Sequence, residues 1–142
     1  MNEENLTRIL AIDFGLKRIG LALTDPLLTF AYPYKTIPND NNLWKNLSQI
    51  INEQGVIKII LGHPLTESGG ENYFHKQWLN FKYKLENDFK IEVILWDERY
   101  TSSMAKEQVM QSVTKKSKRR DKGLLDMNAA AIILKEYLEG SQ

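Results

Sequence analysis

The sequence contains no cysteine and only two histidines among its 142 residues. Without cysteine the chain can form neither a disulfide nor a thiolate metal site, so a reducing compartment is the simpler expectation. Residues 1–5 are polar and acidic and lack the basic start and apolar core of a secretion signal. No apolar run approaches the ~20 residues that span a bilayer. We therefore expect a cytoplasmic protein with no membrane partner.

The composition is otherwise ordinary for a soluble globular protein, with 42% hydrophobic and 26% charged residues. A chain of this length is expected to form one domain, over residues 1–142, with a sizeable core. The net charge is only +1, but residues 115–122 alone carry +5, which leaves −4 on the rest of the chain. Such a segment suits a contact with nucleic acid, and a solvated loop would have the same pattern.

Two apolar runs, 9–12 and 19–23, flank a short segment that holds a glycine and two basic residues. Their β-branched and aliphatic residues predict two strands joined by a tight turn. A looser alternation over 27–36 contains Pro33, which cannot donate a hydrogen bond to a neighbouring strand. We expect this third strand at the edge of the sheet, after a turn capped by Asp25.

The remaining elements are predicted mainly from the spacing of apolar residues. Helical spacing predicts helices over 41–54, 71–88 and 123–139, and a shorter one from 101 or 102 to about 111. Two short apolar strands, 56–61 and 91–96, lie between them, so the pattern predicts an α/β fold with a mixed five-stranded sheet. The second helix carries a stripe of large apolar residues that we interpret as core rather than as a base-stacking surface: Phe74, Trp78, Phe81 and Leu85.

Three separate segments place carboxylates where a buried or edge position is expected. Asp13 ends a strand that is apolar on both faces, where an unpaired carboxylate is strongly unfavourable. Asp126 lies on the apolar stripe of the last helix with Ala130, although an acid in a first helical turn also interacts favourably with the helix dipole. Asp97 and Glu98 close the last strand, where ligands of open α/β sheets gather.

These acids meet at one edge of the sheet if the strands ending at Asp13 and at Asp97 are parallel. A set of oxygen donors without cysteine suits a hard divalent cation, Mg²⁺ or Mn²⁺. Arg99 follows the last acids directly and Thr101 lies two residues further on, and either side chain could hold a phosphate. An ion pair with a nearby acid is the alternative for Arg99.

Four blocks stand in order along the chain: 12–20 (IDFGLKRIG), 62–65 (GHPL), 97–102 (DERYTS), and Asp126 followed by Ala129 and Ala130. Together they resemble the Holliday-junction-resolvase-like family of pre-16S rRNA nucleases over nearly the whole chain. The resemblance implies a ribonuclease H-like fold with strand order 3-2-1-4-5 and helices on both faces. It also implies divalent-metal-dependent cleavage of nucleic acid and a bacterial role in maturing the 5′ end of 16S rRNA.

By the same resemblance, Asp13, Glu98 and Asp126 are the catalytic carboxylates and hold one or two metal ions. In this strand order the last strand lies two spacings, about 10 Å, from the first. We prefer Glu98 to Asp97 because its longer side chain spans that gap better. The sequence departs from the family at His63, where the usual residue is aliphatic, and we interpret this histidine as a tolerated loop substitution rather than a catalytic base.

Basic and hydroxyl side chains near the four blocks are expected to contact backbone phosphates, which gives salt-dependent and sequence-tolerant binding. These are Lys17, Arg18, Arg99, Thr101, Lys115, Lys116, Lys118, Arg119, Arg120 and Lys122. Structured RNA is the favoured partner, branched DNA is the alternative, and pre-ribosomal particles would carry the RNA.

Three other functions are compatible with these residues. One is a Holliday-junction-resolvase-type DNA nuclease, and another is a non-catalytic nucleic-acid-binding module on the same fold. The third is an ATP-handling protein, because Asp13-Phe14-Gly15 before a hairpin also resembles the first phosphate loop of sugar kinases and actin-like ATPases. Those proteins enclose the nucleotide between two such domains, and this chain is long enough for only one.

Overall fold

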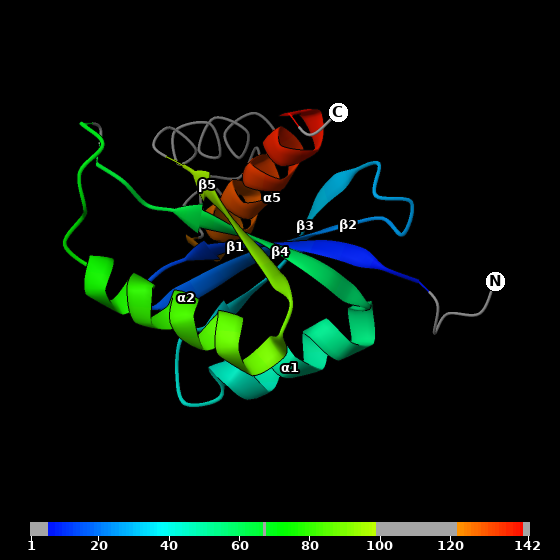
Figure 1. The fold of residues 1–142 in the computed structure, drawn as a ribbon, viewed down its shortest axis with the longest axis horizontal. Helices are drawn as coiled ribbons and strands as arrows, with labels where there is room; N and C mark the ends of the chain where they lie inside the picture. The colour runs from blue at the N-terminus through cyan, green and yellow to red at the C-terminus, as the bar shows by residue number, and fades with distance from the viewer. Residues whose placement is uncertain (1–5, 67, 99–121, 141–142) are drawn as a thin grey trace.

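The structure is a computed structural model and describes residues 6–66, 68–98 and 122–140. Along these residues the elements follow in the order expected for an α/β fold, with a strand hairpin first and a long helix last (Figure 1). Their bounds are β1 Arg8–Phe14, β2 Arg18–Thr24, β3 Ala31–Pro38, α1 Leu43–Gln54, β4 Val56–His63, α2 His75–Phe89, β5 Glu92–Asp97 and α5 Lys122–Gly140.

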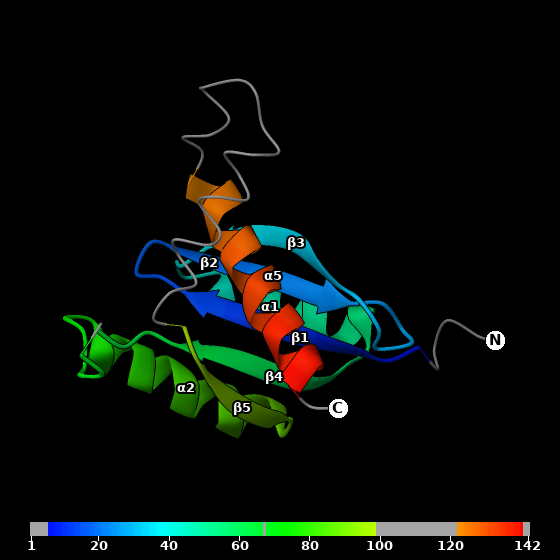
Figure 2. The ribbon, with the colours of Figure 1, turned by 90° about the horizontal axis from the view of Figure 1, so that it is seen from above.

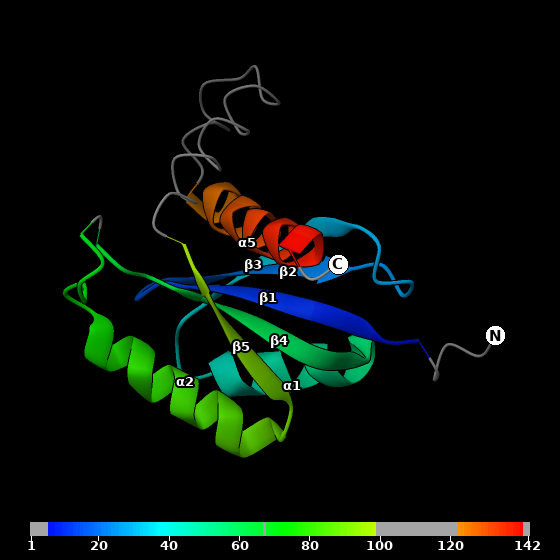
Figure 3. The same ribbon diagram turned by 45° about the horizontal axis from the view of Figure 1, so that its top comes forward.

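The five strands form one mixed sheet in the order β3-β2-β1-β4-β5. β2 pairs antiparallel with β1 and with β3, whereas β4 pairs parallel with β1 and with β5. Helix α5 covers one face of the sheet and α1 and α2 cover the other (Figure 3). Seen from above, α5 crosses the central strands (Figure 2). The predicted mixed sheet and its strand order are therefore confirmed, and the parallel strands β1, β4 and β5 end at the same edge.

The third strand begins at Ala31 rather than at residue 27, because Asp25 organises the preceding segment into a loop. Its Oδ1 accepts the backbone N–H of Thr29 at 2.9 Å and that of Phe30 at 2.6 Å, and Leu28 has a positive φ of 58°. Hydrogen bonds from the amides of Phe30 and Thr29 hold the pKa of Asp25 below its usual value. The expected turn-capping role of Asp25 is confirmed.

The other boundaries shift by smaller amounts. Helix α2 begins at His75 instead of residue 71, because Glu71 forms an isolated β-bridge with Leu65 and the Asn72 side chain accepts the N–H of Phe74. Strand β4 continues two residues past its predicted end, to His63. Gly55 ends α1 in the left-handed region, at φ 63°, as predicted. The predicted helix 101–111 lies outside the described residues, as does all of the basic segment except residue 122.

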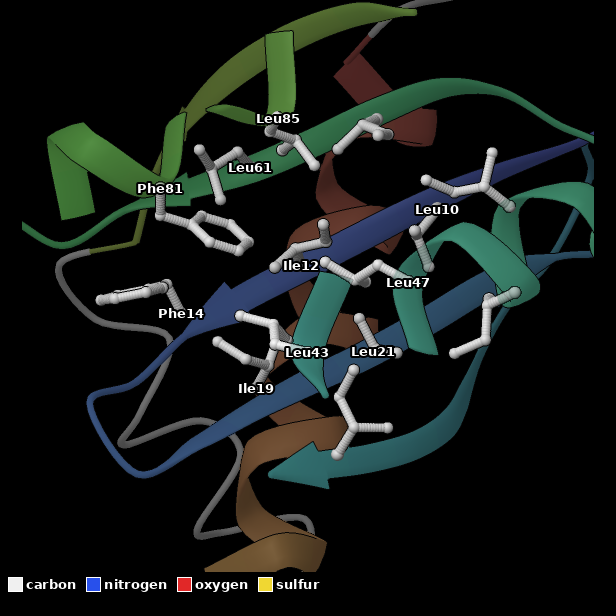
Figure 4. Packing of buried hydrophobic residues seen from close by; sticks show 14 of the residues in the cluster. Leu10, Ile12, Phe14, Ile19, Leu21, Leu43, Leu47, Leu61, Phe81 and Leu85 are labelled. Carbon is white, nitrogen blue, oxygen red and sulfur yellow. The ribbon is translucent and has the colours of Figure 1, made fainter. Parts of the chain in front are cut away.

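Strand alternation divides the core between the two faces of the sheet. The larger cluster lies under α1 and α2 and includes Leu10, Ile12 and Phe14 of β1 (Figure 4). The smaller cluster lies under α5 and includes Ile9 and Ala11 of the same strand. The aromatic stripe of α2 belongs to the larger cluster: Trp78, Phe81 and Leu85 are buried and Phe74 packs against them, so its interpretation as core is confirmed.

Two polar contacts join α5 to the neighbouring strands β4 and β5. Lys58 of β4 donates to the hydroxyl of Tyr137 at 3.0 Å, and the Trp96 indole of β5 donates to Glu136 at 2.9 Å. Ala130 and Ile133 are completely buried against the sheet, as the apolar stripe predicts. None of the helices in the described ranges is long and apolar enough to cross a membrane.

Replacement of Leu85 by alanine is expected to lower the free energy of unfolding by about 2–5 kcal/mol. The side chain is completely buried, and alanine keeps the helix propensity high, so the loss comes from packing. Urea denaturation measures it. Leu27→Ala is the matched control, because Leu27 is 80% exposed and its replacement should change stability by less than about 0.5 kcal/mol. Equal losses in the two variants would contradict the described core.

Candidate functional site

Asp13 lies on the α5 face of the sheet, close to the end of β1. Ile9 and Ala11 of β1 pack under α5, and alternation places Asp13 next on the same face. Phe14, the following residue, packs in the cluster under α1 and α2. The carboxylate is therefore half-buried between the sheet and α5, where desolvation is strong.

Two glycines lie on either side of Asp13 and leave space for Asp126 and Glu98. Gly20 of β2 is the register partner of Asp13, and a Cβ at Gly20 would overlap the backbone carbonyl of Asp126 and come within 2.9 Å of its Cβ. Gly62 of β4 lies on the other side, where a Cβ would overlap the Glu98 carboxylate. The absence of these two side chains lets α5 and the segment after β5 approach Asp13.

Asp13 and Glu98 form a hydrogen-bonded carboxyl pair. Burial raises the pKa of Asp13 to about 6; the hydrogen bond from Glu98 opposes this, and the Asp126 charge adds to it. The pKa of Glu98 is raised well above its usual value by burial, by the Asp13 charge and by that same hydrogen bond. The protonated Glu98 thus donates to Asp13, and the pair shares a proton at a pH where isolated carboxyls are ionised.

Asp126 is held by Arg18 at the start of β2. The guanidinium Nε lies 2.9 Å from Asp126 Oδ2, and both side chains are partly exposed. Across the described ranges, no three Asp, Glu or His side chains converge closely enough to hold one ion in this arrangement. The structure therefore brings Asp13 and Glu98 together directly, and Asp126 interacts with Asp13 through its charge.

Glu98 and Asp97 differ in their positions. Trp96 packs under α5, so alternation directs Glu98 to that face, whereas Asp97 is exposed and pairs in register with His63 of β4. The longer side chain does reach Asp13, as expected. His63 stacks on the Trp78 ring at 4.4 Å, on the opposite face from Asp13, and burial and the nearby His75 lower its pKa. This position keeps the imidazole away from the carboxyl pair, although the His63 backbone carbonyl accepts the N–H of Glu98 at 3.3 Å. His63 is the last residue of β4 rather than part of the loop that the sequence had suggested.

The predicted phosphate-contacting residues are only partly described. Lys17 is exposed in the β1–β2 turn, and Arg18 is engaged by Asp126. Lys122 begins α5, but its side chain is not described. Seven further residues lie outside the described ranges and their roles stay predictions: Arg99, Thr101, Lys115, Lys116, Lys118, Arg119 and Arg120.

Comparison with known proteins identifies the family. The family model described as "RuvX: Holliday junction resolvase" matches residues 7–140. The chain belongs to this family. Among curated relatives, a protein of Sulfurihydrogenibium sp. named "Putative pre-16S rRNA nuclease" is 38% identical over 136 residues, covering 94% of this chain and 91% of the relative. A protein of the same name from Prosthecochloris aestuarii is 35% identical and covers 99% of both chains.

Solved structures share the fold at much lower identity. Fowlpox virus resolvase in complex with Holliday junction DNA aligns with a TM-score of 0.63 at 14% identity, covering 94% of this chain and 98% of that chain. T. thermophilus RuvC in complex with its Holliday junction substrate aligns with a TM-score of 0.59 at 14% identity and covers 95% of each chain. The expected ribonuclease H-like fold is confirmed.

Sequence reasoning missed two features of this site. Gly20 and Gly62 are isolated glycines inside apolar strands, a pattern that indicates close approach of another segment, and their positions could have been interpreted in that way. The Arg18–Asp126 ion pair joins residues 108 positions apart, and no local pattern indicates such a contact.

Gly20→Ala is expected to lower the free energy of unfolding by about 1–3 kcal/mol, because the new methyl overlaps backbone of α5 that cannot rotate away. Displacing α5 also moves Asp126 from Asp13, so the pKa of Asp13 should fall, which NMR titration measures. Gly70→Ala is the control, since its nearest neighbour would be the Thr66 hydroxyl at 3.4 Å. A Gly20→Ala protein that matches Gly70→Ala in both properties would contradict the described approach of α5.

Wild-type stability in chelator should fall as pH rises from 3.8 to about 6, because folded Asp13 keeps a proton that the unfolded chain releases. Asp13→Asn removes the part of this dependence that comes from Asp13, while the raised pKa of Glu98 keeps its own contribution. At pH 7.5 the variant should therefore unfold at higher urea than wild type, with a gain of about 1–3 kcal/mol. Below pH 4 the two proteins should be equally stable, because Asp13 is then protonated in both the folded and the unfolded chain. A stability difference that is the same at both pH values would show that Asp13 is not protonated preferentially in the fold.

Proposed function

We propose that this protein is a divalent-metal-dependent nuclease that hydrolyses phosphodiester bonds, with Asp13, Glu98 and Asp126 as its catalytic carboxylates. The observation that carries the proposal is the Asp13–Glu98 pair, two carboxyls with raised pKa values held against each other beside α5. Membership of a nuclease family supports the reaction class. Perturbed carboxyls at the carboxyl edge of a parallel sheet are typical of a functional site.

The donor set suits Mg²⁺ or Mn²⁺. Hard divalent cations prefer carboxylate oxygens, and a bound cation would relieve both the repulsion and the desolvation that now keep a proton on the pair. Asp13, Glu98 and Asp126 are the residues that would hold the metal. When bound, one or two such ions supply an activated water and neutralise charge on the leaving oxygen.

The protein's own residues would then position the substrate. Arg18 neutralises Asp126 and lies at the mouth of the site, where its guanidinium suits a phosphate oxygen. Lys17 extends the positive charge along the exposed β1–β2 turn. Phosphate contacts of this kind fix the register of the nucleic acid without reading its sequence.

The substrate we infer is structured RNA, with processing of the pre-16S rRNA 5′ end as the cellular task, on pre-ribosomal particles. This inference is supported by relatives named "Putative pre-16S rRNA nuclease" that cover nearly all of the chain. Branched DNA is the second candidate. It is favoured by the description of the family model and by the shared fold of resolvases complexed with Holliday junctions.

Purified protein should cleave a precursor 16S rRNA transcript with Mn²⁺ and not with chelator. Asp13→Asn and Glu98→Gln should reduce cleavage to the chelator level, because each removes a metal-binding oxygen without enlarging the side chain. Gel analysis of end-labelled transcript measures the products, and a four-way DNA junction tested alongside decides between the two substrates.

Asp97→Asn is the matched control, since Asp97 is adjacent in sequence but exposed at the end of β5. It should retain most of the wild-type activity. Binding of both nucleic acids without metal-dependent cleavage would contradict a nuclease and favour a binding module. Loss of activity in Asp97→Asn with retention in Glu98→Gln would reassign the third carboxylate.

A further inference from the structure

A cavity of about 370 Å³ lies on the other face of the sheet, beside the end of β1. Its aromatic lining is Phe14, Phe81 and the half-buried Trp44. The Phe14 and Phe81 ring centroids are 4.9 Å apart and those of Trp44 and Phe81 are 5.2 Å apart, so the three rings pack as one unit. Figure 4 shows Phe14 and Phe81 where the β1 arrow ends. The volume falls within the range of about 300–1,000 Å³ common for small-ligand sites.

Polar side chains of α2 complete the lining. Gln77 and Asn80 are three positions apart on the helix, exposed, and without a side-chain hydrogen bond to any residue that the structure describes. Lys84 lies one turn further on, with its Nζ 5.1 Å from the Trp44 ring centroid and 2.9 Å from Asp88. The cavity thus offers two amides with free donors and acceptors and the half-buried Trp44 ring, while Phe14 and Phe81 are 6% and 5% exposed and form its floor. The Lys84 ammonium nearby is paired with Asp88.

The β1–β2 turn connects this cavity to the carboxylates. Asp13 and Phe14 are consecutive and lie on opposite faces, so the two sites share the edge of the sheet. Asn39, another lining residue, donates from its side chain to the Gly15 carbonyl and from its backbone to the Lys17 carbonyl, each at 2.9 Å. These bonds fix the turn as a common rim, with Lys17 exposed on it.

We propose that this cavity binds an unpaired base of the nucleic acid, which reaches it by passing over the β1–β2 turn. The inference rests on the proposed function only for the presence of a nucleic-acid strand. Unstacked bases are recognised by aromatic surface and by hydrogen bonds to their edges, and amides can supply both donors and acceptors. An apolar peptide side chain fits less well, because it would cover Gln77 and Asn80 without pairing them.

The occupant follows from the same chemistry. A base in a duplex is stacked and paired, so only an unpaired nucleotide of a loop, bulge or strand end presents a free edge and face. The site therefore selects single-stranded features close to the cleaved bond. Phosphate contacts of Lys17 on the turn would strengthen binding of any nucleic acid, and the cavity would make binding stronger for RNA that contains unpaired nucleotides.

Binding in chelator tests the proposal without cleavage. Fluorescence anisotropy with a short labelled single-stranded RNA and with its blunt duplex should show about tenfold weaker single-strand binding in the Gln77→Ala/Asn80→Ala variant. Duplex binding and the salt dependence should be unchanged, since neither residue contacts phosphate. Asn87→Ala is the control, an exposed amide of α2 outside the cavity lining, and should match wild type.

Cross-linking locates the base directly. RNA with 4-thiouridine in a single-stranded position should cross-link to peptides that contain Phe14, Trp44 or Phe81, and the double variant should lose most of this product. The inference would be overturned if the double variant bound single-stranded and duplex RNA with equally weakened affinity, or if it bound both as wild type does. Cross-links to other peptides of the wild-type protein would also overturn it. A wild-type protein that binds neither RNA would overturn the proposed function as well, whereas binding without cleavage would leave the cavity assignment standing.

Discussion

The site depends on the close approach of α5 to the sheet at Gly20. Any side chain at Gly20 would overlap the α5 backbone at Asp126, and a side chain at Gly62 would occupy the place of Glu98. With hydrogen atoms at both positions, carboxyl groups from β1, α5 and the segment after β5 come near one another. The raised pKa of Asp13 follows from this crowding, since burial and the Asp126 charge both oppose its ionisation. The glycines at positions 20 and 62 therefore determine both how closely α5 packs on the sheet and how far the pKa of Asp13 is raised.

Much of the fold could be predicted because its signals are local. Short continuous apolar runs, a proline in a loosely alternating segment and Gly55 after a helix each indicate one element, and the structure confirms those elements. Boundaries were predicted less well where a side chain competes with regular structure. Asp25 binds backbone amides that a longer strand would have used, and the β-bridge at Glu71 delays α2.

The sequence indicates which acidic residues form the site, but it indicates less well which residues they contact. Asp13 stood out because a carboxylate in an apolar strand is unfavourable without a partner, and Glu98 was preferred on reach. The pairing of Arg18 with Asp126 depends on how α5 docks, which no local pattern encodes. The α2 aromatic stripe was predicted as core, and it is core, yet Phe81 also lines a cavity because a packed ring can still expose one edge.

The alternation of Asp13 and Phe14 has a consequence for how the family can vary in length. A deletion or insertion of one residue within β1 would exchange the two faces, placing a carboxylate among aromatic rings and a phenyl group among carboxyls. The same change in the exposed turn between β1 and β2 would leave every strand residue on its own face. Length variation among related proteins should therefore be confined to such loops, while the number of residues in β1 between its first buried residue and Asp13 stays fixed.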